Sequence, residues 1–104
     1  MSLDAHGCQE VLALSLADRG ATATWDDLVR PVLAGVGERW AASGRSVEVE
    51  HAFSAVVAAT FAGHAARLDR ARNDRPVLLA SVPDELHDLP LVGLQAALAD
   101  VGIR

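Results

Sequence analysis

The first half of the chain carries apolar residues at the three- and four-residue steps of amphipathic helices. Over residues 4–17 this spacing is loose, and Gly20 stands where a helix cap would sit. A second stretch of this kind begins at Thr24 and reaches Trp40. The Thr24 hydroxyl can cap the helix, because an acidic side chain follows three residues later. Its apolar face consists of Trp25, Leu28, Val29, Val32, Leu33, Val36 and Trp40. We expect two helices here, and Pro31 should kink the second because proline removes a backbone donor.

A third helix is expected after the break at residues 43–45. Ser46 can cap it, and its apolar positions continue to Leu68, which extends the predicted helix toward Arg72. The expected inward face consists of Val49, Phe53, Val56, Val57, Thr60, Phe61, His64 and Leu68. Three consecutive helices of this kind predict a helical bundle.

The last quarter of the chain has a different pattern. Residues 77–82 form a continuous apolar run that ends at Pro83, which favours a strand buried on both faces, as in parallel sheets. A helix is then expected over residues 88–101, with Gly102 as its cap. The predicted inward residues of this helix are Leu91, Leu94, Leu98 and Val101.

A lone strand cannot satisfy its backbone hydrogen bonds, and the sequence contains no second strand. We therefore predict a mostly α chain with two parts. Residues 1–75 form a partial helical bundle, and residues 76–104 supply one β-strand and one helix of a truncated α/β, Rossmann-like domain. The strand, residues 76–82, is expected either to pair with a second chain or to be poorly ordered.

Composition and charge exclude several function classes. The chain has 51% hydrophobic and 22% charged residues, which is typical of one small soluble domain. It lacks both an export signal and an apolar run near the roughly 20 residues that span a bilayer, so we expect a cytoplasmic protein without a membrane partner. The net charge is -5 and the nine basic residues are scattered arginines. Any contact with DNA must therefore come from a separate domain.

Four residues around the break between the second and third helices can converge in space. Trp40 lies at the end of one helix, and Val47, Glu50 and His51 lie at the start of the next. A tryptophan at the end of an amphipathic helix is more often part of a core than of a ligand site. A glutamate near a helix N-terminus can simply favour the helix dipole. The pattern alone therefore leaves both interpretations open.

Two further residues with metal-binding or acid-base chemistry follow the predicted strand. Glu85 and His87 lie in the loop that enters the last helix, where open α/β sheets place their ligands. A histidine between acidic residues in a loop is usually solvated. Glu48 and His51 also form a Glu-x-x-His pair of the kind found in di-iron bundles, but the second motif and the two further carboxylates that such a centre needs are not visible.

The spacing of Trp40, nine intervening residues and the pair Glu50-His51 resembles the motif of cobalamin-dependent MerR-type photoreceptors, which are bacterial transcription regulators. The resemblance implies that Trp40 covers the upper axial side of the corrin ring of adenosylcobalamin, where the 5′-deoxyadenosyl group sits. Val47, Glu50 and His51 would surround that group. A flat aromatic face supplies apolar contact, and Glu and His supply hydrogen bonds to nucleoside polar atoms.

The segment from Glu85 to Pro90 resembles the Asp-x-His-x-x-Gly segment of cobalamin-binding Rossmann-like domains. The resemblance implies that His87 is the lower axial ligand of cobalt, and that Glu85 orients it through a hydrogen bond. Glu in place of Asp keeps this bond with a longer arm, whereas Pro90 in place of Gly stiffens the loop. The later loops of the corrin site are absent from this sequence. We therefore expect the full-length protein to hold adenosylcobalamin, and this fragment to bind it weakly or not at all.

The resemblance implies a sensor without catalytic residues, and not an enzyme. Cobalamin would alter the packing of the helices and hence the homo-oligomeric state of a regulator, and light could act by breaking the cobalt-carbon bond. Ala41 stands where some of these photoreceptors have a histidine that can ligate cobalt after photolysis. A sensor that responds to the cofactor in the dark is therefore a further alternative. Two alternatives are a corrinoid methyl carrier of a methyltransferase system and a regulatory interaction domain without cofactor.

Overall fold

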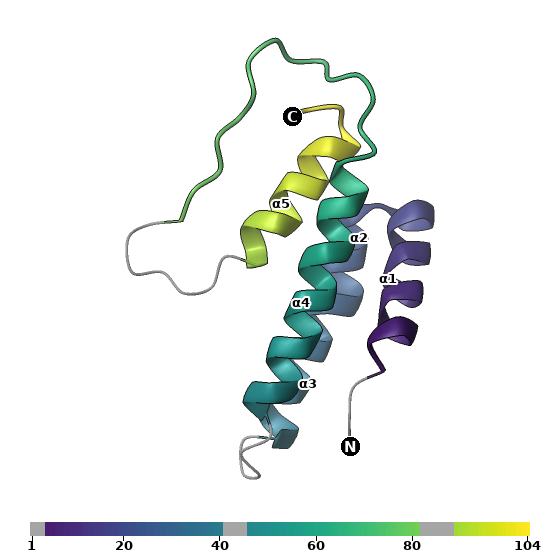
Figure 1. Cartoon of the computed structure of the whole chain (residues 1–104), viewed down its shortest axis with the longest axis vertical. Coiled ribbons are helices and arrows are strands. Elements are labelled where there is room, and N and C mark those ends of the chain that lie inside the picture. The colour runs from purple at the N-terminus through teal and green to yellow at the C-terminus, as the bar shows by residue number, and fades with distance from the viewer. Residues whose placement is uncertain (1–3, 41–45, 82–88) are drawn as a thin grey trace.

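The computed structural model describes residues 4–40, 46–81 and 89–104, and these ranges are mostly α-helical. The elements are α1 (Ala5–Arg19), α2 (Ala21–Thr24), the π-helical turn η1 (Trp25–Val29), α3 (Arg30–Trp40), α4 (Ser46–Ala65) and α5 (Leu89–Asp100). In Figure 1, α1 and α4 run in one direction, and the continuous run of α2, η1 and α3 returns in the opposite one. α5 packs along α4 in the same direction as α4. The prediction of a mostly α helical bundle is confirmed.

The first helix is closed at both ends by local contacts. The Asp4 carboxylate accepts a hydrogen bond of 3.0 Å from the backbone N–H of Gly7, which caps the N-terminus. Gly20 ends the helix with a φ of 89°, a conformation that favours glycine, and so lets the chain reverse into α2. The predicted cap at Gly20 is confirmed, and α1 continues slightly beyond the predicted range.

The second helix begins at Ala21, so the prediction that Thr24 caps it is wrong. Thr24 lies inside the helix and is fully buried. Its hydroxyl oxygen is 2.6 Å from that of Ser15 on α1, and this hydrogen bond satisfies a buried polar group. The sequence does not distinguish a capping threonine from a buried one, because the burial of Thr24 depends on its contact with α1.

The expected irregularity at Pro31 takes the form of a π-helical turn. The five residues of η1 immediately precede Arg30, whose backbone N–H donates to the carbonyl oxygen of Trp25. A proline has no N–H to donate, and its ring crowds the carbonyl of the preceding turn in a regular α-helix. The wider π turn accommodates the proline while the helix continues into α3.

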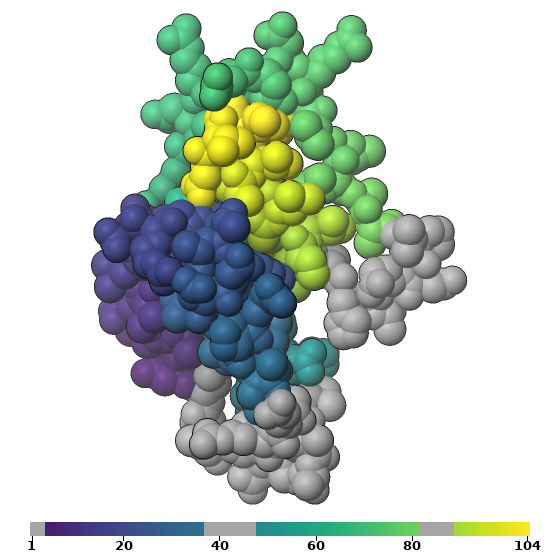
Figure 2. All heavy atoms as spheres, turned by 180° about the vertical axis from the view of Figure 1, so that it is seen from behind, coloured from purple at the N-terminus to yellow at the C-terminus, as the bar shows by residue number. Residues whose placement is uncertain are grey.

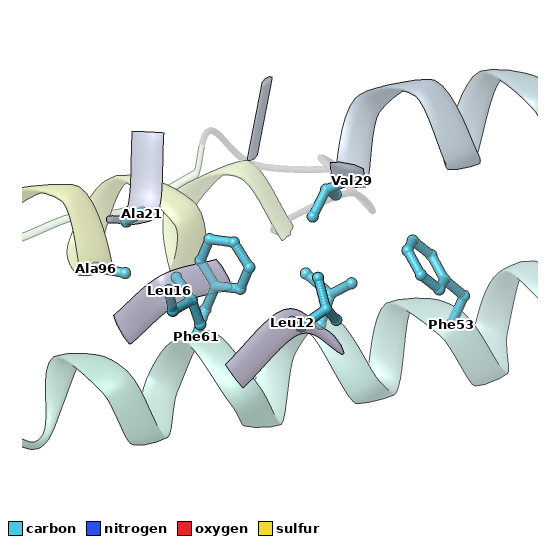
Figure 3. Close-up of a cluster of buried hydrophobic side chains, with 8 residues drawn as sticks. Leu12, Leu16, Ala21, Val29, Phe53, Phe61 and Ala96 are labelled. Carbon is cyan, nitrogen blue, oxygen red and sulfur yellow. The ribbon is translucent and has the colours of Figure 1, made fainter. Parts of the chain in front are cut away.

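The core lies between α1, α4 and the second helical run. Phe53, Val57 and Phe61 form a buried stripe at four-residue intervals on α4, as the pattern predicted. The other members of the core are Leu12, Leu16, Ala21, Val29 and Ala96, and most of these side chains point toward one another in Figure 3. The Trp25 and Phe61 rings meet edge to face, with centroids 6.0 Å apart and an interplanar angle of 85°.

The predicted β-strand is not formed in residues 77–81, and Val82 lies outside the described residues. The Leu78 side chain is 89% exposed, whereas a strand of a parallel sheet would bury it. The N–H of Val77 donates to the carbonyl oxygen of Arg104 at 2.8 Å, but no other strand is present in the described ranges to continue the pairing. The division of the chain into residues 1–75 and 76–104 remains a prediction.

α4 ends at Ala65, earlier than the predicted extension toward Arg72. The following segment is instead fastened to the end of the chain. The N–H of Arg72 donates to the carbonyl oxygen of Gly102 at 2.6 Å. The Asn73 side-chain amide accepts from the Arg104 N–H at 3.1 Å and donates to the Arg104 carbonyl oxygen at 3.0 Å. Gly102 has a φ of 83° just after α5, which confirms the predicted helix cap.

α5 packs on the bundle through the buried Gly93 and Ala96, which corrects the predicted inward positions of Leu94 and Val101, whereas Leu91 and Leu98 are partly buried. Leu94 is 46% exposed and Val101 is 55% exposed, whereas Gly93 and Ala96 are buried. A Cβ atom at Gly93 would lie 2.8 Å from the Trp25 ring, so only glycine permits this approach. Figure 2 shows residues 89–104 packed directly against the second helical run, while much of the segment after α4 stands away from the bundle.

Candidate functional site

The candidate site lies at one end of the bundle, where α3 ends and α4 begins (Figure 1). Trp40 is the last residue of α3, and Val47 is the second residue of α4. The backbone therefore places both residues at the same end of the molecule, as the sequence predicted. The side chains of these two residues lie outside the described part of the structure, so their roles remain predictions.

The first turns of α4 carry the residues that were predicted to surround the adenosyl group. Val47, Glu50 and His51 are separated by three and four positions, and such residues are neighbours on a helical surface. His51 is exposed, and Glu50 is half-buried. Glu50 lies one turn before Phe53, on the same side of α4 as the buried stripe. A carboxylate therefore stands at the end of this stripe.

Neither Glu50 nor His51 forms an ion pair or a side-chain hydrogen bond with another described residue. The exposed His6, by contrast, pairs with Glu10 on the next turn of α1, with 2.9 Å between the imidazole nitrogen and the carboxylate oxygen. A carboxylate accepts hydrogen bonds, and an imidazole can donate one and accept another. With respect to the described part of the chain, these two groups are therefore accessible to a ligand.

The expected lower-face residues, Glu85 and His87, lie outside the described residues, and their roles remain predictions. α5 begins at Leu89, immediately after this segment. Within residues 4–40, 46–81 and 89–104, no three His, Cys, Asp or Glu side chains are grouped so that they could hold a metal ion. The di-iron alternative for Glu48 and His51 therefore gains no support from the described ranges.

Two cavities of the described structure lie away from Glu50 and His51. One, of about 440 Å³, lies between the end of α4, the segment that follows it, and α5. The other is an apolar groove of about 400 Å³ between α1, the second helical run and α4, and its lining includes Cys8 and Phe53. Neither cavity is lined by Glu50 or His51. Within the described residues, Glu50 is therefore half-buried and His51 exposed outside these two cavities.

A polar cluster at the other end of α4 was not predicted from the sequence. The Asp100 carboxylate of α5 accepts a hydrogen bond of 2.6 Å from the Ala21 N–H, and its second oxygen lies 2.6 Å from Nε2 of His64. One local signal was available. Asp100 is the last residue of a helix, where the dipole disfavours an acid, so an acid at this position suggests a partner elsewhere.

None of the helices in the described ranges is both long and apolar enough to cross a membrane.

Comparison with known proteins gives two matches. The family described as "B12 binding domain" matches residues 1–62, which include α1 to α3, most of α4 and the residues Trp40, Val47, Glu50 and His51. The chain is also similar to the HTH-type transcriptional repressor CarH of Myxococcus xanthus, with 35% identity over 97 residues. This alignment covers 91% of the chain but 31% of the relative, so the chain spans about a third of that protein's length. No solved structure matches the chain significantly.

The family match and the site lie in the same part of the molecule. The matched residues form the bundle and carry the end of α3 and the start of α4, where the upper-face residues were predicted. The match covers 62 of the 104 residues, which is more than half of the chain. The resemblance found in the sequence is thereby confirmed at the level of the family, and the chain belongs to the B12 binding domain family.

Proposed function

We propose that this chain is the cobalamin-sensing part of a bacterial transcription regulator and is not an enzyme. The observation that carries the proposal is the face of α4 that presents Val47, Glu50 and His51 beside the end of α3, where Trp40 lies. Membership of the B12 binding domain family supports the ligand class. The similarity to a protein named as an HTH-type transcriptional repressor supports the regulatory role.

The described residues fit an upper-face role for adenosylcobalamin. Glu50 sits half-buried where the apolar stripe of α4 ends, and His51 is exposed one position further on. Both groups can therefore form hydrogen bonds with the polar atoms of an adenosyl group, while the Trp40 ring would supply apolar contact. Bound cobalamin would supply a light-sensitive cobalt-carbon bond. His87 would supply an imidazole ligand to the cobalt, and Glu85 would orient that histidine.

The rest of the proposal concerns a longer protein. The chain spans about a third of the matched repressor, and it carries a net charge of -5. A negatively charged domain is poorly suited to contact phosphate groups. We therefore place DNA binding in a separate domain, and we expect cobalamin to act by changing how copies of the regulator associate.

The direct test is absorption spectroscopy of a chain extended past Arg104, mixed with adenosylcobalamin or with methylcobalamin, in the dark and after illumination. We expect a spectral shift with the adenosyl form in the dark, and weak or no binding by residues 1–104 alone. A clear preference for methylcobalamin would favour the methyl-carrier alternative. No shift with either form would refute cobalamin binding and leave the cofactor-free alternative.

Substitutions test the residues predicted for the upper face and for the lower face of cobalamin separately. Trp40→Ala or Glu50→Gln should weaken adenosylcobalamin binding about tenfold, as expected from the loss of a contact worth about 1.4 kcal/mol. His87→Ala should remove the spectral signature of histidine ligation to cobalt. His6→Ala is a matched control, because His6 is an exposed histidine that pairs with Glu10 on α1. Equal effects of the control and of His87→Ala would contradict the assignment of the ligand.

A further inference from the structure

The Asp100 carboxylate of α5 contacts both α2 and α4 at the end of the bundle opposite the candidate site. Oδ2 of Asp100 accepts a hydrogen bond of 2.6 Å from the N–H of Ala21, which is the first residue of α2. Oδ1 of Asp100 lies 2.6 Å from Nε2 of His64 in the last turns of α4. We propose that Asp100 is a latch that holds α5 on the bundle, and that α5 can detach as a unit when this latch opens.

The helix dipoles explain why this carboxylate is more stable with α5 docked than with α5 free. Asp100 is the last residue of α5, and a negative charge is disfavoured at the C-terminal end of a helix. When α5 is docked, the same carboxylate lies at the N-terminal end of the run that α2 begins, where a negative charge is favoured. His64 lies near the C-terminal end of α4, where a positive charge is favoured. Asp100 remains at the unfavourable end of α5 in both states, and docking adds the favourable interaction with the N-terminal end of the second helical run.

The apolar part of the α5 interface combines small buried residues with larger side chains that are only partly buried. The buried residues of α5 are Gly93 and Ala96, which have little or no side chain to bury. The larger Leu94 and Val101 are largely exposed. Leu89, Val92 and Ala97 are partly buried and pack against the core, so apolar burial also stabilises the docked helix. The polar contacts of Asp100 add to this packing and are lost when α5 detaches.

The Asp100–His64 pair lies at the surface of the bundle, with both side chains partly accessible to water. The His64 side chain is 17% exposed and that of Asp100 is 32% exposed. An ion pair on the open surface usually contributes little, whereas partial burial strengthens the interaction and raises the cost of leaving one partner alone. Removal of the carboxylate leaves two polar groups without their partner, the N–H of Ala21 and the imidazole of His64.

The test is hydrogen exchange, followed by mass spectrometry, on the 104-residue chain and its Asp100→Ala variant. Exchange reports local opening, so a detachable α5 should exchange faster while the rest of the bundle stays protected. We expect exchange in residues 89–100 to accelerate about tenfold or more, because a hydrogen bond to a charged group is lost. Exchange over residues 53–61 of α4 should remain unchanged.

Asp18→Ala is the matched control. Asp18 is an exposed acid in the last turn of α1, and it forms no ion pair or side-chain hydrogen bond with another described residue. The control should leave exchange in α5 unchanged. Equal exchange of α5 in the Asp100→Ala and Asp18→Ala variants would overturn the proposal. Equal acceleration in α4 and α5 would also overturn it, because Asp100 would then stabilise the whole fold and not the docking of one helix.

A second pair of variants keeps the test decisive if Asp100→Ala fails to fold. His64→Ala removes one arm of the latch and leaves the hydrogen bond to Ala21 in place, so it should accelerate exchange of α5 by a smaller factor. His64→Gln retains an N–H donor and should restore part of the protection. No difference between His64→Ala and the unsubstituted chain would refute a role for this arm. The measurement uses no cobalamin. A negative result would therefore refute the role of Asp100 without bearing on cobalamin binding.

Discussion

Gly93→Ala is a sensitive probe of how α5 packs on the bundle. The added Cβ would lie 2.8, 3.1 and 3.3 Å from three carbon atoms of the Trp25 ring. The ring cannot simply move away, because it packs edge to face against Phe61, which is fully buried. The methyl group must therefore push α5 outward or distort the aromatic pair.

The magnitude follows from a comparison with Gly63→Ala. Both glycines lie inside helices, so alanine should gain about 1 kcal/mol of helix propensity at either position. A Cβ at Gly63 has no atom within 4 Å, so this gain should appear in full. At Gly93 the gain is opposed by an overpacking cost of about 1–3 kcal/mol. The propensity terms cancel between the two variants, and Gly93→Ala should therefore be less stable than Gly63→Ala by about 1–3 kcal/mol.

The assay is urea denaturation followed by far-UV circular dichroism, together with thermal melting of both variants. For a domain of this size, each kcal/mol corresponds to about 4–8 °C in melting temperature. We expect Gly63→Ala to melt above the unsubstituted chain and Gly93→Ala to melt below Gly63→Ala. If the two alanine variants were equally stable, α5 would not rest on Trp25 in solution, and the placement of α5 would be refuted.

Three further predictions test the core, the buried hydroxyl pair and the missing strand. Phe61→Ala should reduce the free energy of unfolding by about 3–5 kcal/mol in a urea titration, because this ring is fully buried, and a loss below about 1 kcal/mol would contradict its central position. Thr24→Val should cost about 1–2 kcal/mol by leaving Ser15 without its partner, and the double variant with Ser15→Ala should recover most of that loss, whereas additive losses would exclude a coupled pair. Leu78→Ser should change the free energy of unfolding by less than about 0.5 kcal/mol, because Leu78 is 89% exposed. A loss above about 2 kcal/mol would show that Leu78 is buried.

The position of the candidate site was available from the sequence because it depends on order along the chain. Trp40 and the pair Glu50-His51 lie close to the break between two helices, and any antiparallel pair of helices brings such residues to one end. The half-buried state of Glu50 was not predicted. It follows from its position one turn before Phe53, on the side of α4 that faces the core. The face of a helix that becomes buried is decided by its neighbours.

Elements whose causes are local could be predicted from the order of the residues. The buried stripe of Phe53, Val57 and Phe61 follows from helical periodicity, because the apolar residues repeat every four positions. Gly20 and Gly102 end their helices because both adopt positive φ angles, of 89° and 83°, which glycine tolerates best. A residue's own conformational preference and that of its near neighbours are sufficient for these features.

Features that depend on distant partners could not be predicted from local patterns. The second helix begins at Ala21, whose N–H is bonded by Asp100 from 79 positions away. The small face of α5 is buried because the Trp25 ring lies opposite Gly93. Residues 77–81 do not form the strand that their composition favours, because a strand is stabilised by a second strand, and the described ranges contain none. Each outcome depends on atoms that are remote in sequence, and a local pattern carries no information about them.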